Sequence, residues 1–371
     1  MSKSIAMCCV LSAQLVFVSS VAVAQTSFQD VTAFAGLSST ILRGGSAWRD
    51  FNGDGLPDVL ISSHLLHRPA LYRNKGGGKF VDVTLGVMDA PTNLAKCVVP
   101  GEPVGPWGDH HGWAWADFDN DGDRDIIVLV GAMRGLGCGP NQLYVNNGGH
   151  FSDHAVQYNI DYQYSRGRMP TWIDYDNDGI LDLIHGSLKR PDGTSPPTLF
   201  RGTGSSFVDV RNSTKFKPID SFGVFIGDVV GSSRLEMLMV GPLAAALPLA
   251  PGAISVPSTS LRFVDTTAIP FKDVTPIRID PTSQYDIALA DFDGDLRSDV
   301  FVANSWTAAS AQKGHRLYLN RATGSSIRRR PRASTPSSAP APGVWSPPIS
   351  IMTGTWISTS LAGQGLKKRR T

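Results

Sequence analysis

The sequence predicts an all-β fold, and three observations support this prediction. The chain of 371 residues contains 38 Gly and 25 Pro without a Gly at every third position, which indicates many tight turns rather than a collagen helix. Its apolar residues fall in short runs that lack helical periodicity. An acidic nine-residue pattern also recurs along the chain at intervals of about 60 residues.

Four near-complete copies of the acidic pattern and one decayed copy set the organisation of the chain. The near-complete copies occupy residues 50–58, 117–125, 174–182 and 291–299, and each begins and ends with Asp. The decayed copy, residues 228–236, keeps an acid only at its first and last positions. Successive copies start 67, 57, 54 and 63 residues apart, so these five loops mark five repeating units.

The residues around each loop repeat as well. An apolar stretch such as 113–115 precedes the loop, and an aliphatic run such as 126–130 follows it. Further on stand a Leu-Tyr-x-Asn motif, as at 71–74, and then a Phe-x-Asp motif, as at 80–82. Each unit therefore holds four short strands between turns. Such a series predicts a β-propeller of four-stranded blades with about five blades present, because a sandwich would not repeat its loops.

The acidic loops predict calcium sites. Carboxylates at alternate positions of a tight turn point at a common centre, where they repel one another unless a cation lies among them. Oxygen ligands without His or Cys select a hard ion, and a flexible, crowded loop favours Ca²⁺ over Mg²⁺. We expect ligands at the side chains of the first, third, fifth and ninth positions and at the backbone carbonyl of the seventh. The expected ligands are Asp50, Asn52, Asp54, Leu56 and Asp58 in the first loop; Asp117, Asp119, Asp121, Asp123 and Asp125 in the second; Asp174, Asp176, Asp178, Ile180 and Asp182 in the third; and Asp291, Asp293, Asp295, Arg297 and Asp299 in the fifth.

Two other interpretations of the loops are open. An EF-hand or dockerin loop has its last acid at the twelfth position and is followed by a helix, whereas here the last acid is the ninth residue and a strand follows. Solvated acidic turns without a metal are the remaining alternative, above all in the fifth loop, where Leu296 replaces a Gly. The fourth loop is expected to be empty, because Val230 and Ser232 replace carboxylates and Arg234 adds a positive charge.

The folded region is predicted to be acidic. Residues 25–321 hold 25 Lys or Arg against 32 Asp or Glu, a formal charge of −7. Calcium in four loops would nearly neutralise this charge, so we expect the stability of the protein to depend on calcium.

The first 24 residues are predicted to be a secretory signal peptide, because Lys3 is followed by the apolar stretch 5–23 and by Ala22-Val23-Ala24. An uncleaved anchor is the alternative, although polar residues interrupt the stretch. No later segment is apolar enough to span a membrane, so we expect a secreted, periplasmic or cell-surface protein. Cys97 and Cys138 then remain and are expected to form a disulfide, with two buried thiols as the alternative.

The motifs together resemble the FG-GAP/VCBS repeats of integrin α-subunit propellers, and look closest to exported bacterial relatives of cartilage acidic protein that carry an ASPIC/UnbV domain. The resemblance rests on the acidic loops, the leading aromatic residues, Leu-Tyr-x-Asn and Phe-x-Asp-Val-Thr, and it covers roughly residues 28–320. It implies a calcium-stabilised propeller, usually seven-bladed, that serves binding or adhesion outside the cytoplasm. It also implies that the segment 28–32 completes the last blade and closes the ring.

The chain departs from this pattern after residue 321. Residues 322–371 contain eight Lys or Arg and no acid, which predicts a disordered basic tail. A shifted reading frame is our preferred explanation. When each new codon is built from the third base of one residue and the first two bases of the next, Met352-Thr353 gives Asp and Trp356-Ile357 gives Asp. These two Asp residues are four positions apart, as are the fifth and ninth positions of the loop. Resequencing the gene tests this explanation. We therefore expect a ring truncated from seven blades, with open sheet edges that favour association, and no nucleic-acid partner.

The function that we prefer is a non-enzymatic binding or adhesion scaffold for a protein or glycan, with Ca²⁺ as the only cofactor. The sequence contains no Gly-x-Ser-x-Gly, Walker or Gly-x-Gly-x-x-Gly motif, and no catalytic residue is nominated. A propeller-fold polysaccharide lyase or hydrolase is the alternative, with His110 and His111 beside Trp107, Trp113 and Trp115. We expect those tryptophans to pack between blades instead. The sequence identifies neither the ligand nor the oligomeric state.

Overall fold

The computed structural model describes residues 28–37, 43–63, 67–92, 107–132, 135–193, 197–218, 224–229, 236–240, 246–256, 260–279, 285–304 and 315–321. The expected signal peptide, the basic tail and Cys97 lie outside these residues, so the predictions about them stay predictions. The described strands form five antiparallel sheets, each built from strands that follow one another in the chain. The all-β prediction is therefore confirmed.

Each of the five sheets contains one repeat of the sequence. Sheet 1 consists of β1 (Arg43–Arg49), β2 (Asp58–Ser63), β3 (Ala70–Asn74) and β4 (Phe80–Asp82). Sheet 2 consists of β5 (His110–Ala116), β6 (Asp125–Val130), β7 (Gln142–Asn147) and β8 (His150–Asp153). Sheet 3 consists of β9 (Gly167–Ile173), β10 (Asp182–Ser187), β11 (Leu199–Gly202) and β12 (Phe207–Asp209).

The last two sheets follow the same plan. Sheet 4 consists of β13 (Val224–Gly227), β14 (Glu236–Val240), β15 (Leu261–Asp265) and β16 (Lys272–Asp273). Sheet 5 consists of β17 (Tyr285–Ala290), β18 (Asp299–Asn304) and β19 (Arg316–Tyr318), so within the described residues it has three strands where the others have four.

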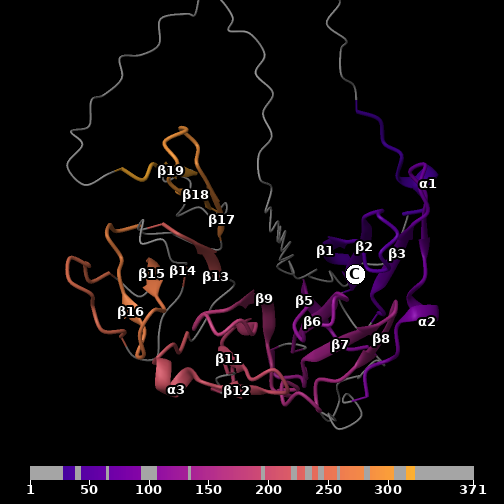
Figure 1. Ribbon diagram of the computed structural model, residues 1–371, viewed down its shortest axis with the longest axis horizontal. Coiled ribbons are helices and arrows are strands. Elements are labelled where there is room, and N and C mark those ends of the chain that lie inside the picture. Colours follow the sequence, from indigo (N-terminus) through magenta and orange to yellow (C-terminus); the bar gives the residue numbers. More distant parts are fainter. Residues whose placement is uncertain are drawn as a thin grey trace, which may run out of the picture.

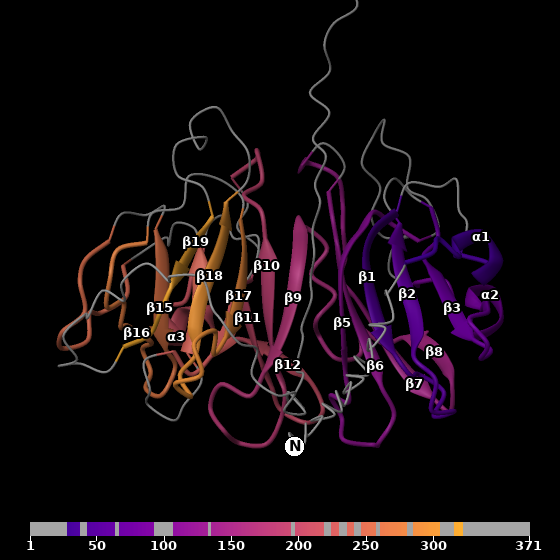
Figure 2. The ribbon, with the colours of Figure 1, turned by 90° about the horizontal axis from the view of Figure 1, so that it is seen from above.

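The sheets are arranged like the blades of a propeller. In Figure 1 they follow one another around an arc, with the first strand of each sheet nearest the centre and sheets 1 and 5 at the two ends. Figure 2 shows that the strands of neighbouring sheets run along a common direction. The inner strands β5 and β9 approach so closely that a Cβ on Gly112 would lie 1.8 Å from the carbonyl oxygen of Arg168. A ring of seven such blades stays a prediction.

Five apolar clusters form the core of the described residues: four of them lie between successive sheets, and a fifth lies on the other face of sheet 1. Sheets 1 and 2 share a layer that contains Leu60 and Phe151, and sheets 2 and 3 share one that contains Leu143 and Trp172. Further layers join sheet 3 to sheet 4 and sheet 4 to sheet 5. Because β-strand side chains alternate between faces, each inner sheet supplies one set of residues to the sheet before it and another set to the sheet after it.

Three single-turn helices were not predicted from the sequence. They are α1 (Thr32–Ala35), α2 (Thr84–Val87) and α3 (Arg211–Thr214). Helices of four residues are too short to leave a periodic apolar pattern, which explains why the periodicity of the sequence did not reveal them. None of the described helices has the length and apolar character that a membrane span requires.

Candidate metal centre

Each acidic loop connects the first two strands of its sheet, and the first, third and fifth loops wind around the side chain of their first residue. Asp50 Oδ1 accepts hydrogen bonds from the backbone N–H groups of Gly53 at 2.8 Å and Asp54 at 3.2 Å, and its Oδ2 accepts one from Gly55 at 2.7 Å. Asp291 accepts three equivalent bonds in the fifth loop. Asp side chains are favoured in turns for this reason, so the first acid of the loop shapes the turn.

The fifth loop keeps the same turn although its sequence differs at the sixth position. Gly55, Gly122 and Gly179 have φ angles of 83°, 96° and 83°, and Leu296 has a φ of 66° at the corresponding position. This left-handed region carries no steric cost for Gly but is unfavourable for a residue with a side chain. The replacement of Gly by Leu therefore strains the fifth loop without changing its path.

The ninth acid of each loop is a buried brace for the backbone. Asp125 Oδ2 accepts a hydrogen bond from the N–H of Phe118 at 3.3 Å, and Oδ1 accepts one from the N–H of Asn146 on β7 at 2.9 Å. The same two bonds are made by Asp58, Asp182 and Asp299, and all four side chains are buried. Each ninth acid thus ties the start of its loop to the third strand of its sheet.

This bracing role was missed in the sequence analysis, which treated the ninth acid only as a ligand. A signal for it was present, because an Asn ends the Leu-Tyr-x-Asn motif in three of the sheets. The amide of Asn146 donates from Nδ2 to the carbonyl oxygen of Arg124, next to the brace, and Asn74 and Asn320 make equivalent bonds. The recurring Asn therefore marks the strand position to which the loop is tied.

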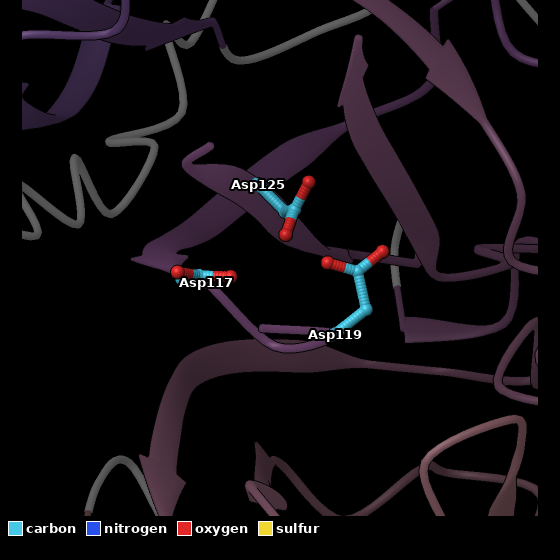
Figure 3. Close-up of side chains that lie close together, drawn as sticks. All are labelled: Asp117, Asp119 and Asp125. Carbon is cyan, nitrogen blue, oxygen red and sulfur yellow. The ribbon is translucent and has the colours of Figure 1, made fainter. Parts of the chain in front are cut away.

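Three of the predicted loops gather carboxylates into compact clusters. In the second loop, oxygens of Asp117, Asp119 and Asp125 lie within 4.8 Å of one another, and Figure 3 shows their carboxylates converging. Asp174, Asp176 and Asp182 form the same cluster in the third loop, whereas the fifth loop gathers Asp291, Asp293 and Asp295. Carboxylate oxygens at this spacing can bind one divalent cation.

The second loop also contains carboxylate oxygens that lack a partner. Oδ1 of Asp117 and Oδ1 of Asp119 are buried and accept no hydrogen bond from the described protein. A buried acceptor without a partner is costly, and a buried charge without compensation more so. The donors of this cluster are all hard oxygens, so they fit a hard divalent cation such as Ca²⁺.

The buried ninth acids of the second and third loops hold their protons more tightly than ordinary carboxylates. Burial, reinforced by the charges of Asp119 and Asp121, raises the pKa of Asp125 to about 7. Burial and the neighbouring acids of the third loop likewise raise the pKa of Asp182 to about 7. These shifts arise chiefly because burial disfavours the charged form of a carboxyl group, and the negative charges of the neighbouring acids add to the effect.

Arginine side chains compensate part of this charge in three of the loops. Arg201 on β11 places Nε 2.6 Å from Oδ2 of Asp176 and Nη2 2.5 Å from Oδ2 of Asp178. The corresponding pairs are Arg73 with Asp54 in the first loop, and Arg321 with Asp293 and Asp295 in the fifth. Arg73 and Arg201 occupy the same position of the repeat, whereas Arg321 lies two residues beyond it, and the second loop has Val145 at this position. Its nearest described arginine pair is Arg124 with Asp117, at 3.6 Å.

Several predicted ligands lie outside the compact clusters. Asp121 Oδ1 accepts the N–H of Asp123, and Asp123 Oδ2 accepts the N–H of Gly148 in the next turn. In the first loop, Asn52 Oδ1 accepts the N–H of Asp54. The remaining members of the predicted ligand set, including the carbonyls of Leu56, Asp123, Ile180 and Arg297, stay predictions.

The fourth loop is described only at its ends. Residues 230–235 lie outside the described residues, so the prediction that this loop holds no metal stays a prediction. Glu236 is buried, and its Oε2 accepts the N–H of Val229 at 2.8 Å. This decayed copy therefore keeps the bond from the ninth acid to the start of the loop.

The two histidines considered for catalysis are buried at the inner strand β5. His110 is 1% exposed, its Nε2 lies 3.0 Å from Oε1 of Gln142, and burial lowers its pKa to about 4. His111 is 7% exposed and its Nε2 lies 3.1 Å from Oδ2 of Asp109. Trp113 stacks edge-on against His110, and Trp107 is buried between sheets 1 and 2. These side chains take part in packing and internal hydrogen bonds.

Cys138 takes part in a disulfide bond, and its partner lies outside the described residues. The pairing of Cys138 with Cys97 stays a prediction.

Comparisons with known proteins support the repeat pattern. A family model described as the FG-GAP-like repeat matches residues 50–128 and 117–185. A search of curated proteins gave no match. Among solved structures, the biofilm matrix protein Bap1 of V. cholerae aligns with a TM-score of 0.39 and 12% identity, over 76% of this chain and 38% of that chain. This chain thus spans less than two thirds of that protein. The closer resemblance to proteins with an ASPIC/UnbV domain stays an expectation.

Proposed function

We propose, on the premise that residues 50–185 of the chain are FG-GAP-like repeats, that this protein is an exported, calcium-binding β-propeller that acts as a binding or adhesion scaffold. The observation that carries the calcium proposal is the pair of buried, unpartnered oxygens on Asp117 and Asp119, which converge with Asp125. Ca²⁺ would supply the positive charge that these carboxylates lack.

The scaffold proposal is supported by where the ionisable residues lie. The acids of the described part are concentrated in the loops and braces that shape the blades, and the histidines of β5 are buried. Burial of His110 and His111 gives little support to the alternative of a polysaccharide lyase or hydrolase. We propose a protein or glycan as the partner, and secretion, the periplasm or the cell surface as the location.

Calcium binding is tested by isothermal titration calorimetry on the mature chain after treatment with a chelator. We expect several Ca²⁺ to bind, the tightest of them in the second loop, because its acids have the least compensation by arginine. The matched variants are Asp119→Asn in the second loop and Asp228→Asn in the fourth. The first should remove one binding event and the second should remove none; an unchanged titration for both variants would contradict the proposal.

The scaffold function is tested separately, on a panel of polysaccharides and with the variant His111→Ala. We expect no turnover. Turnover that His111→Ala abolishes without a change in melting temperature would establish the enzyme instead.

The arginine pairs predict a graded affinity among the loops. Arg201→Gln should raise the Ca²⁺ affinity of the third loop about fivefold, because it removes a unit positive charge beside the acids that bind the ion. Arg201 is partly exposed, so its loss should cost less than about 1 kcal/mol of stability without calcium. The control is Arg211→Gln, which breaks the pair with Asp209 outside any acidic loop and should leave the affinity unchanged.

A further inference from the structure

The segment at residues 28–32 has the sequence and the turn of a fourth blade strand. In sheets 1 to 4, the Asp at the end of the fourth strand accepts a hydrogen bond from the N–H two residues later, through Asp82, Asp153, Asp209 and Asp273. Asp30 Oδ1 accepts the same bond from the N–H of Thr32 at 2.9 Å. The single-turn helix α1 then follows, as α2 follows β4 and α3 follows β12.

This segment belongs to no sheet among the described residues. Phe28 is fully exposed, whereas Phe151 and Phe207, at the same position of the motif in sheets 2 and 3, are buried. Leu37, farther along, packs on sheet 1 as Phe216 packs on sheet 4. The segment therefore leads into sheet 1 as the last strand of a preceding blade does, but the described residues contain no other strand of that blade.

Sheet 5 shows the complementary deficiency. Within the described residues, no strand pairs with the outer edge of β19. In sheet 1 the equivalent strand, β3, has partners at this edge. The N–H of Val83 donates to the carbonyl oxygen of Leu71 at 2.9 Å, and the N–H of Leu71 donates to Oγ1 of Thr84 at 2.8 Å. Leu317 occupies the position of Leu71 in the same Leu-Tyr-x-Asn motif.

The register of sheet 1 therefore specifies how the two parts would pair. Arg73 lies opposite Val81 there. By the same alignment Leu319 lies opposite Gln29, and Leu317 meets Val31 and Thr32. A strand added at an open edge is held by main-chain hydrogen bonds, and the side chains fix its register.

The open faces of the two end sheets match as well. Two residues before the first loop acid, Trp115 and Trp172 pack on the preceding sheet, but Trp48 in sheet 1 is 54% exposed. Directly after the first loop acid, Phe51 and Phe118 pack on the following sheet, but Phe292 in sheet 5 is 47% exposed. Each end thus exposes aromatic side chains at the positions that form the layers inside the arc.

We propose that sheet 5 of one copy of this chain packs on sheet 1 of a second copy, and that residues 28–31 of the second copy become the fourth strand of that sheet. One contact then supplies both missing parts. Residues 28–31 pair with the open edge of β19, and the sheet face that carries Trp48 packs against the sheet face that carries Phe292. The contact is head-to-tail, because it joins two different surfaces of the chain.

A second copy is favoured over closure within one chain because the segment is held at sheet 1. Lys79 Nζ donates to the carbonyl oxygen of Phe34 at 2.7 Å and lies 3.3 Å from the centre of its ring. In both Figure 1 and Figure 2, α1 lies beside sheet 1, on the other side of the molecule from β19. Closure within one chain would instead require the two ends of the arc to come together.

Cysteine cross-linking between two preparations tests the proposal. One preparation carries Gln29→Cys and the other Leu319→Cys, both at exposed positions, and the two are mixed under oxidising conditions. We expect a disulfide-linked dimer that contains one chain of each kind, at least tenfold above the control. The control replaces Gln29→Cys by Val208→Cys, which lies at the same position of the motif and is 49% exposed but is already paired in sheet 3.

The outcomes are distinct. A cross-link no stronger than that of the control overturns the proposal. So does a monomeric disulfide in the double variant carrying both cysteines, since it shows that the chain closes on itself. Sedimentation of the unaltered chain is a second readout: we expect its mass to rise with concentration and a synthetic peptide of residues 26–37 to reverse that rise. A mass that stays monomeric at all concentrations also overturns the proposal.

Discussion

Excess Ca²⁺ is expected to stabilise this protein strongly, and the gain is expected to be larger at pH 7.5 than at pH 5. At a free concentration about 100 times the dissociation constant, each occupied loop should add about 2.7 kcal/mol to the free energy of unfolding. Three loops contain a cluster of acids, so several ions can bind. The total gain in the free energy of unfolding from calcium should therefore be larger than the change caused by any single substitution. Thermal unfolding with Ca²⁺ and with a chelator measures the difference.

The pH dependence follows from the raised pKa values of Asp125 and Asp182. Without calcium their pKa is about 7 in the folded chain, against an ordinary value of 3.8. Between about pH 4 and pH 7 the unfolded chain loses these protons before the folded chain does, so stability without calcium should fall as the pH rises through this window. Calcium binds the ionised acids and should remove this fall. The same pH dependence with calcium and with a chelator would contradict the interpretation.

Replacing Asp125 by Ala is expected to lower the free energy of unfolding by about 3 kcal/mol even in the presence of a chelator. The side chain is buried and accepts hydrogen bonds from the backbone N–H groups of Phe118 and Asn146. Without it both donors are left without these partners, at about 1 to 3 kcal/mol each, and relief of the buried carboxylate offsets part of that loss. Chemical unfolding with a chelator present isolates this effect from calcium binding.

The matched control is Asp121→Ala in the same loop. Asp121 is exposed and accepts one local hydrogen bond, from the N–H of Asp123. The substitution Asp121→Ala should lower the free energy of unfolding by less than about 1 kcal/mol when calcium is absent. If Asp125→Ala costs no more than Asp121→Ala, the ninth acid is not a brace and acts only as a ligand.

Much of the fold could be predicted because the chain repeats itself. The recurrence of Asp117 to Asp125 and its flanking motifs identified the strands, their number in each unit and the blade-like assembly. The single-turn helix α2 could not be predicted, because four residues carry no periodicity. The dual role of Asp125 was also hidden, because a ligand and a buried brace require the same carboxylate and differ only in what surrounds it.

The sequence alone determined the repeat, the all-β class and the acidic loops, because strand alternation and turn chemistry are local properties that each unit carries within itself. Only the tertiary structure decided which acids lie together, since Asp117, Asp119 and Asp125 meet when Asn146 on another strand fixes the end of the loop. It also decided which aromatic residues are covered. Trp48 and Trp172 occupy the same position of the repeat, yet they are 54% and 6% exposed, because burial depends on whether a neighbouring sheet is present.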